Sequence, residues 1–193
     1  PMPFSEHSLF DGFPEETNAP YGIAKRASLV MLQAYQAEYG QQFNYLIPTN
    51  LYGPGDNFDD GSSHVIPALI KKCLQAQERG DDEITVWGTG KASRDFVYVE
   101  DVAKALVLAM DNYDRPEPLN LGSGDEVQIS TLVYYIKEAT GFEGATVYDT
   151  SKPDGQPRRC LDTKQAKAAL GWQADTTLKE GLQKTVEWYL NND

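Results

Sequence analysis

Tyr21 and Lys25 are residues whose types and spacing could support proton transfer. They lie four positions apart in the stretch P-Y-G-I-A-K-R, so on a helix their side chains would share one face. A tyrosine, with a reference pKa of about 10, is a poor acid or base at neutral pH. A cation one turn away stabilises the phenolate and lowers that pKa, which suits the pair for moving a proton to or from a substrate oxygen. The same spacing occurs by chance in many helices, so two ordinary surface residues are the alternative.

A helix that ends at Gly40 is expected to carry this pair, since Pro20 suits a first turn and glycine commonly follows a last one. The next run, F-N-Y-L-I, is typical of a short buried strand. Residues 48–62 are rich in Gly, Pro, Asn and Asp, which predicts a long loop. Loops of this length in a compact domain are often functional.

Strands and helices alternate along the rest of the chain. Strands are expected at 84–87, 95–99, 118–121 and 145–149. Helices are expected at about 63–77, 101–110, 130–140, 163–170 and 177–191. The stretch W-G-T-G-K-A is expected to be a hairpin turn after the first of these strands. The alternation indicates an α/β protein.

Composition narrows the classes of function. The formal net charge of -12 argues against a nucleic-acid partner, which would need a basic face. No apolar run approaches the roughly 20 residues of a membrane span, so no membrane partner is expected. The two cysteines, Cys73 and Cys160, are far apart and show no metal-site spacing. We therefore expect no metal and a reducing, cytoplasmic setting.

Six motifs follow one another along the chain, and their order is more specific than any of them alone. They are P-Y-G-I-A-K, P-T-N-L-Y-G-P-G-D-N, S-S-H-V-I-P-A-L-I, V-W-G-T-G-x-x-x-R-D-F-V-Y-V-E-D-V-A, L-N-L-G-S-G and S-K-P-D-G-Q-P-R-R. The series resembles the extended short-chain dehydrogenase/reductase family of nucleotide-sugar enzymes. Within that family it is most similar to the GDP-L-fucose synthase branch. The resemblance extends over essentially all of the 193 residues.

The resemblance implies an NADP-dependent enzyme that epimerises and reduces GDP-4-keto-6-deoxymannose. Tyr21 would be the proton donor for ketone reduction, and Lys25 would tune it while binding the cofactor ribose. His64 would adjoin the cofactor and act as an acid in the epimerisation half, a role that suits imidazole because it titrates near neutral pH. The nicotinamide side of the cofactor site would be lined by Pro48, Thr49, Asn50 and Leu51.

The resemblance also assigns residues to the nucleotide-diphosphate part of the substrate. These are Lys72, Trp87, Arg94 and, in a loop over that site, Lys152 and Asp154. Lys72 stands where bacterial members often carry arginine. A lysine keeps the positive charge of that arginine but lacks the planar guanidinium that can donate two parallel hydrogen bonds to a phosphate. Each residue has a simpler explanation as well: Trp87 could belong to the core, Arg94 could pair with Asp95 at the surface, and His64 could be an exposed helix-start residue.

Glycine motifs in the chain do not supply a cofactor phosphate site. L-N-L-G-S-G-D-E-V follows a strand, but Val127 stands where the dinucleotide fingerprint needs a third small residue. A turn beside the substrate is the better interpretation, and Arg158 and Arg159 either contact phosphate or lie in solvent. The family's glycine-rich phosphate loop does not occur in the 193 residues. We therefore expect the chain to be the C-terminal portion of such an enzyme, inactive by itself.

The resemblance implies a two-part organisation. Residues 1–62 would form the C-terminal part of a Rossmann-type NAD(P)-binding fold. Residues 63–193 would mainly form a small α/β substrate-binding domain, with about 100–125 returning to the Rossmann sheet. A GDP-sugar substrate and a homodimer through the Tyr21 helix are implied too. Another nucleotide-sugar epimerase or dehydratase, and a non-catalytic nucleotide-sugar-binding module, are the alternatives.

Overall fold

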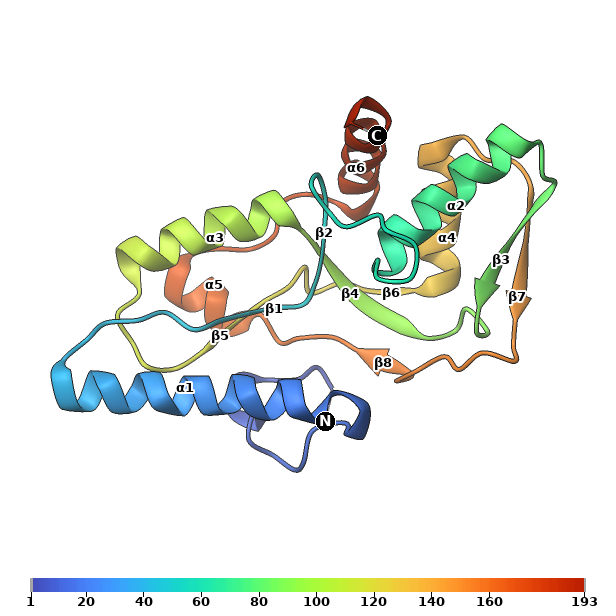
Figure 1. The fold of residues 1–193 in the computed structure, drawn as a ribbon. Coiled ribbons are helices and arrows are strands. Elements are labelled where there is room, and N and C mark those ends of the chain that lie inside the picture. Colours follow the sequence, from blue (N-terminus) through green and yellow to red (C-terminus); the bar gives the residue numbers. More distant parts are fainter. Residues whose placement is uncertain (1, 193) are drawn as a thin grey trace.

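Three short sheets, each joining segments far apart in the sequence, organise residues 2–192 of the computed structural model (Figure 1). In the first sheet β1 runs parallel to β5, and in the second β3 runs parallel to β7. In the third, β4 is flanked by parallel β2 and antiparallel β6, and β8 adds a short parallel pair. The strands are β1 (Leu46–Pro48), β2 (Asn50–Tyr52), β3 (Glu83–Trp87), β4 (Ser93–Tyr98), β5 (Leu119–Leu121), β6 (Glu126–Gln128), β7 (Ala145–Asp149) and β8 (Arg158–Arg159).

Six α-helices and two short 3-10 helices complete the described part of the chain, which confirms the predicted α/β class. The α-helices are α1 (Ala19–Tyr39), α2 (Val65–Arg79), α3 (Val99–Asn112), α4 (Ile129–Thr140), α5 (Lys164–Leu170) and α6 (Leu178–Asn192). The 3-10 helices are η1 (Glu6–Ser8) and η2 (Glu16–Asn18). The predicted end of the first helix is confirmed, because Gly40 has a φ of 66° and donates its N–H to the Gln36 carbonyl.

Three short strands were not expected from the sequence. β2 lies inside the segment predicted as one long loop, while β6 and β8 lie in turn-rich stretches. Strands of two or three residues carry no readable alternation, and here their pairing with β4 defines them. The predicted hairpin turn after β3 is wrong, since β3 pairs with β7 and β4 pairs with other strands.

The elements gather into two groups, shown at opposite ends of Figure 1. One contains α1, β1, β5, α3 and α5, with α5 packed against β5 and α3. The other contains α2, α4, β3 and β7, with α6 packed against α4. The long strand β4 runs from one group toward the other and pairs with partners along its whole length. No described helix is both long and apolar enough to cross a bilayer.

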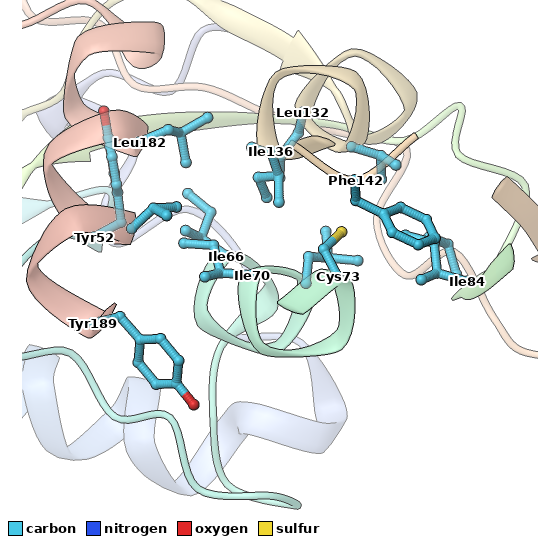
Figure 2. Packing of buried hydrophobic residues seen from close by; sticks show 14 of the residues in the cluster. Tyr52, Ile66, Ile70, Cys73, Ile84, Leu132, Ile136, Phe142, Leu182 and Tyr189 are labelled. Carbon is cyan, nitrogen blue, oxygen red and sulfur yellow. The ribbon is translucent and has the colours of Figure 1, made fainter. Parts of the chain in front are cut away.

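The larger hydrophobic core lies where α2, α4 and α6 meet (Figure 2). Ile66, Ile70 and Cys73 follow one another at helical spacing on α2 and are buried, as are Leu132 and Ile136 on α4. This periodicity places one apolar stripe of each helix against the others. On α6, Leu182 and Val186 are buried at the same spacing, whereas Gln183, Lys184 and Glu187 on its outer face are exposed.

Helix α6 approaches β2 closely at Gly181. A Cβ at this position would overlap the Tyr52 hydroxyl oxygen and would lie 2.8 Å from the ring carbon that bears it. Tyr52 is 2% exposed and meets the Tyr98 ring edge-on at 5.7 Å between centroids, so it has little room to move. Burial raises the pKa of Tyr52, which keeps the phenol neutral at this contact.

Asp101 ties the start of α3 to the segment before α6. Its carboxylate, 1% exposed, accepts hydrogen bonds from the Thr176 and Asp175 N–H groups and from Lys104, at 2.8 to 3.1 Å. Its backbone carbonyl accepts from the Trp172 indole N–H. Burial acts to raise the pKa of Asp101, but the hydrogen bonds from Lys104 and Thr176 outweigh it and hold the pKa below its usual value.

Substitution of Gly181 by alanine is expected to destabilise the protein by about 1–3 kcal/mol, because overpacking against Tyr52 exceeds the gain of about 1 kcal/mol in helix propensity. Urea denaturation would measure this. Tyr52→Phe in the Gly181→Ala background should restore part of the loss, since it removes the overlapping oxygen. Gln183→Ala, on the exposed face of the same helix, is the matched control and should change stability by less than about 0.5 kcal/mol. A neutral Gly181→Ala variant would refute the close approach.

Candidate active site

A cavity of about 1130 Å³ lies between the N-terminal segment, α1 and β1. It brings together five residues predicted for the catalytic and cofactor sites. These are Tyr21, Lys25, Pro48, Thr49 and Asn50. The Lys25 Nζ lies 5.4 Å from the centroid of the Tyr21 ring, and the Tyr21 side chain is well exposed, so its phenol is accessible to a ligand. The expected side-by-side placement of the two residues on one helical face is therefore present.

Tyr45 is a cavity residue to which the sequence analysis gave no role. Its hydroxyl donates a hydrogen bond of 2.7 Å to the Lys25 carbonyl, which attaches the start of β1 to the helix that carries Tyr21. Burial and the nearby Tyr21 raise the pKa of Tyr45, so it stays a neutral donor. No spacing in the sequence relates Tyr45 to α1; only the fold brings them together.

The segment between β1 and β2 is held by β4 and β5. The Thr49 hydroxyl and the Asn50 amide donate to the Asp95 carbonyl at 3.0 and 2.7 Å, and the Thr49 N–H donates to the Leu121 carbonyl. Leu51, the next residue, does not line the cavity. Successive residues of a strand point to opposite faces, so a shared motif does not place every member at the same site.

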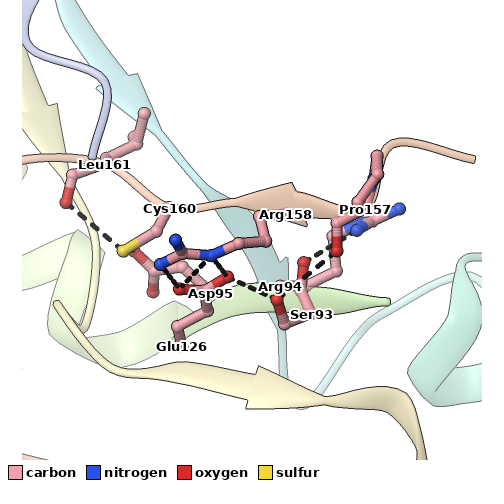
Figure 3. A network of polar contacts seen from close by, with 8 residues as sticks. All are labelled: Ser93, Arg94, Asp95, Glu126, Pro157, Arg158, Cys160 and Leu161. Carbon is pink, nitrogen blue, oxygen red and sulfur yellow. Dashed lines mark hydrogen bonds and ion pairs between the residues drawn. The ribbon is translucent and has the colours of Figure 1, made fainter. Parts of the chain in front are cut away.

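Asp95 is the buried polar centre beside the cavity. Its carboxylate is fully buried and accepts hydrogen bonds from the Ser123 N–H and hydroxyl, while the Cys160 Sγ lies 3.9 Å away (Figure 3). Burial raises the pKa of Asp95, although the hydrogen bonds from Ser123 act against it. A Cβ at Gly122 would overlap this carboxylate, so the G-S-G stretch serves as a turn around Asp95. The alternative explanation of Arg94, in which it pairs with Asp95 at the surface, is wrong because Asp95 is buried and bonded to Ser123.

Arg158 is neutralised within the protein. Its guanidinium makes a bidentate ion pair with Glu126, which also accepts a hydrogen bond from the Ser93 hydroxyl (Figure 3). These two partners lower the pKa of Glu126 to about 2. Arg158 therefore supports the β6–β4–β8 pairing and is not available to a ligand as an uncompensated charge.

Arg94 and Arg159, unlike Arg158, are not neutralised by an ion pair within the described residues. They are directly opposed in the β4–β8 register. Arg94 donates to the Ser93 and Gln156 carbonyls, and burial together with the nearby Arg159 lowers its pKa. Arg159 also lines the cavity that contains Tyr21. The Glu15 and Asp154 carboxylates act on Arg94 from a greater distance and partly offset this lowering of its pKa. Two opposed cations without an ion-pair partner favour an anionic ligand.

Three further predicted substrate residues gather at the end of the β3–β7 sheet. Lys72, on α2, donates a hydrogen bond of 2.7 Å to the Thr85 carbonyl of β3. Lys152, in the loop after β7, places its Nζ 5.5 Å from the centroid of the Trp87 ring. Trp87 is 68% exposed, so the alternative that it belongs to the core is wrong. The exposed indole with the Lys152 ammonium beside it offers a stacking surface for an aromatic, negatively charged ligand.

His64 and Asp154 lie outside the cavity that contains Tyr21. His64 is the exposed residue that precedes α2, and its side chain makes no capping hydrogen bond. Asp154 accepts hydrogen bonds from the Thr89 N–H and hydroxyl across the turn after β3. Cys73 and Cys160 are both free and buried, and burial raises the pKa of each thiol to about 11. Within the described residues no cluster of His, Cys, Asp and Glu could hold a metal.

Known proteins share this arrangement of motifs and fold. The sequence is 45% identical over 192 residues to a probable GDP-L-fucose synthase 1 of Oryza sativa subsp. japonica, covering 100% of this chain and 58% of that protein. It is 38% identical to the GDP-L-fucose synthase of Escherichia coli (strain K12), covering 99% and 62%. The crystal structure of a GDP-L-fucose synthetase from Naegleria fowleri bound to NADP superposes with a TM-score of 0.92 at 35% identity, covering 100% and 62%.

The chain thus spans about three fifths of the length of the relatives it matches. Over that span it is a homologue of GDP-L-fucose synthases, as the order of the motifs predicted. Residues 1–122 match the NAD dependent epimerase/dehydratase family as a whole. This matched region carries Tyr21, Lys25 and the β1–β2 segment of the cavity. The chain therefore belongs to the NAD-dependent epimerase/dehydratase family.

Proposed function

We propose that these residues serve, in the complete enzyme, in the NADPH-dependent epimerisation and reduction of GDP-4-keto-6-deoxy-D-mannose to GDP-L-fucose, and that the 193-residue chain is inactive by itself. The observation that carries the proposal is the pairing of Tyr21 and Lys25 in one cavity with the β1–β2 segment. A phenol next to an ammonium group, open to a ligand, is the arrangement that protonates a carbonyl oxygen during its reduction. Similarity to GDP-L-fucose synthases supports the choice of substrate.

The cavity residues fit the nicotinamide-ribose end of NADP. Lys25 supplies a cation and donors for ribose hydroxyls, and Thr49 and Asn50 are fixed by Asp95 before any ligand arrives. When bound, NADPH would supply the hydride that reduces the C4 ketone of the sugar. Tyr21 would donate its proton to the carbonyl oxygen, and Lys25 would stabilise the phenolate left behind.

A substrate can be placed along the line of cations that leaves this cavity. The keto sugar would lie near Tyr21, and its diphosphate would lie between the opposed Arg94 and Arg159. The base would extend toward Trp87, with Lys152 and Lys72 nearby. In this placement Arg159 links the catalytic cavity to the nucleotide site, because it lines the first and opposes Arg94 at the second.

His64 would return a proton to carbon in the epimerisation at C3 and C5. Hydrogens beside the C4 ketone are acidic, so each inversion needs a base to remove a proton and an acid to replace it. His64 is the exposed residue at the start of α2 and is free of side-chain capping, which leaves its imidazole available. The His64 imidazole would reach the sugar if α2 and the loop before it moved toward the bound substrate.

A homodimer through the helix that carries Tyr21 is part of the same proposal. Among the 21 residues of α1, only Ala19 and Leu29 are buried. The exposed apolar side chains of this helix include Ile23, Val30, Met31 and Tyr35. Such a surface is larger than scattered exposed apolar residues usually make, and it is suited to packing against a second copy.

Tyr21→Phe is expected to lower kcat for NADPH-dependent ketone reduction by about 10²–10⁴-fold, because the proton donor is lost. Spectrophotometric loss of NADPH with GDP-4-keto-6-deoxymannose measures the rate, and GDP affinity by calorimetry should stay within about twofold. Tyr39→Phe is the matched control, since Tyr39 lies on the same helix and is equally exposed at 67%. Unchanged reduction by Tyr21→Phe would contradict the assignment. Both rates are measured in the complete enzyme, and GDP binding without reduction by the unsubstituted complete enzyme would favour the non-catalytic binding module.

His64→Gln is expected to slow solvent-deuterium incorporation at C3 and C5 by about 10²-fold or more while leaving GDP affinity unchanged. The measurement is NMR or mass analysis of the sugar after incubation in D₂O. His7→Gln is the control, because His7 is the other histidine in the chain and is also exposed. Normal incorporation in His64→Gln would mean that another group supplies the proton, as expected of an enzyme that inverts only C4.

Arg159→Ala is expected to weaken GDP binding about tenfold, because one charged hydrogen-bond partner of the diphosphate is lost. Arg158→Ala is the matched neighbour and should weaken binding by less than about twofold, since Glu126 already neutralises Arg158. Calorimetry at two salt concentrations would measure both. Equal losses in the two variants would indicate general charge attraction and would contradict a specific site at Arg159.

A further inference from the structure

The loop that follows β7 is joined by the Asp154 side chain to Thr89, in the turn that follows β3. The Thr89 N–H donates to one Asp154 carboxylate oxygen at 2.6 Å, and the Thr89 hydroxyl donates to the other at 2.7 Å. These residues are 65 positions apart, so the contact joins two separate loops. The Thr89 hydrogen bonds lower the pKa of Asp154, which keeps its carboxylate charged at neutral pH.

The backbone is shaped for this contact. Gly88 has a φ of +82°, and a Cβ there would overlap the Asp154 carboxylate oxygen. Two separate features therefore disfavour a side chain at Gly88: the left-handed backbone conformation and the close approach of Asp154. The Gly88 N–H also donates to the Asp149 carbonyl at 2.9 Å, which fixes the turn against the end of β7. The turn after β3 and the loop after β7 are therefore in direct contact.

Residues on both sides of Asp154 contact the nucleotide-site candidates. Lys152, two positions before it, lies over the exposed Trp87 ring. The carbonyls of Asp154 and Gln156 accept hydrogen bonds from Arg94 at 3.4 and 2.6 Å. One short loop therefore sets the position of a cation beside the indole and the direction of the Arg94 guanidinium. The end of the loop is also attached to β4, because the Ser93 N–H donates to the Pro157 carbonyl at 2.9 Å, whereas Thr89 holds its middle through the Asp154 side chain.

We propose that the Thr89–Asp154 pair is a latch that holds the 150–157 loop in the geometry needed to bind a nucleoside diphosphate, and that Asp154 is a positioning residue. The inference rests on the proposed function for the class of ligand, and on the structure alone for the latch. Each carboxylate oxygen accepts one hydrogen bond from Thr89, which favours a structural role of Asp154 over direct contact with the ligand. A free carboxylate at this place would also repel a diphosphate, whereas an engaged one orders the loop that carries Lys152.

Substitution by asparagine separates positioning from direct contact. An asparagine at 154 can accept from the Thr89 N–H with its carbonyl oxygen and donate to the Thr89 hydroxyl with its amide, so it keeps both hydrogen bonds without the charge. Asp154→Ala removes both. Thr89→Ala retains the backbone N–H and removes the hydroxyl, which donates to Asp154 and accepts from the Lys91 N–H at 3.3 Å. Hydrogen–deuterium exchange of residues 88–91 and 151–157 reports on the latch without any ligand, and calorimetry with GDP reports on binding.

Asp154→Ala is expected to raise amide exchange in these two segments by about three- to tenfold and to weaken GDP affinity by a similar factor, since exposed charged hydrogen bonds of this kind are of modest strength. Asp154→Asn should stay within about twofold of the unsubstituted chain in both measurements. Thr89→Ala should have a smaller effect than Asp154→Ala when made alone. In the Asp154→Ala background it should weaken the attachment of the loop no further, because the contact between residues 89 and 154 is already lost.

Two outcomes would overturn the proposal. Unchanged exchange in Asp154→Ala would show that the loop is held without the latch. Loss of GDP affinity in Asp154→Asn equal to that in Asp154→Ala, with exchange restored, would show that the carboxylate charge itself contacts the ligand. If the unsubstituted chain does not bind GDP, the proposed function fails at this site, and the exchange measurements still decide whether the latch exists.

Discussion

The burial of one carboxylate, that of Asp95, is the constraint on which the site depends. A fully buried acid must have its hydrogen bonds supplied from nearby, because water cannot reach it. Ser123 supplies them from the turn after β5, and the Asp95 carbonyl in turn receives Thr49 and Asn50 from the cavity. A single residue of β4 therefore holds together chain segments that come before it and after it in the sequence.

This junction explains how the cavity and the nucleotide-site candidates are placed relative to each other. Arg94 precedes Asp95 on β4, so fixing the acid also fixes the backbone of the cation beside it. Arg159 is opposed to Arg94 on β8, and Glu126 holds Arg158 next to it through an ion pair. Repulsion between Arg94 and Arg159 is thus sustained by the pairing of β4 with its neighbours. An anion would relieve that repulsion, which is a physical reason for ligand binding at this point.

Much of the fold was predictable because it depends on local signals. The bounds of α1 follow from a proline in its first turn and a glycine with positive φ after its last, and the alternating elements follow from hydrophobic periodicity. Within the site, helical spacing predicted that Tyr21 and Lys25 share one face, and the ordered series of motifs predicted their role; the structure places both residues in the cavity. Trp87 illustrates the limit of such reasoning, since a tryptophan at a strand end could equally be buried or exposed.

The remaining features depend on contacts between distant segments. β2, β6 and β8 are defined by pairing with β4, and no two or three residues of sequence encode that pairing. The difference between Arg158 and Arg159 rests on Glu126, more than 30 positions away, and the place of Tyr45 rests on its contact with α1. His64 and Leu51 belong to recognisable motifs but lie outside the cavity lining, so a motif predicts a neighbourhood more reliably than a contact.

The parallel pairing of β1 with β5 and of β3 with β7 has a consequence for how the protein is made. Parallel partners cannot be joined by a tight turn, so each pair waits until a long intervening stretch has left the ribosome. β8 reaches β4, and α6 closes the larger core, only when the last segments have been synthesised. High contact order of this kind slows folding and leaves apolar surface exposed in the nascent chain. A site built from such widely separated residues is therefore completed late in folding.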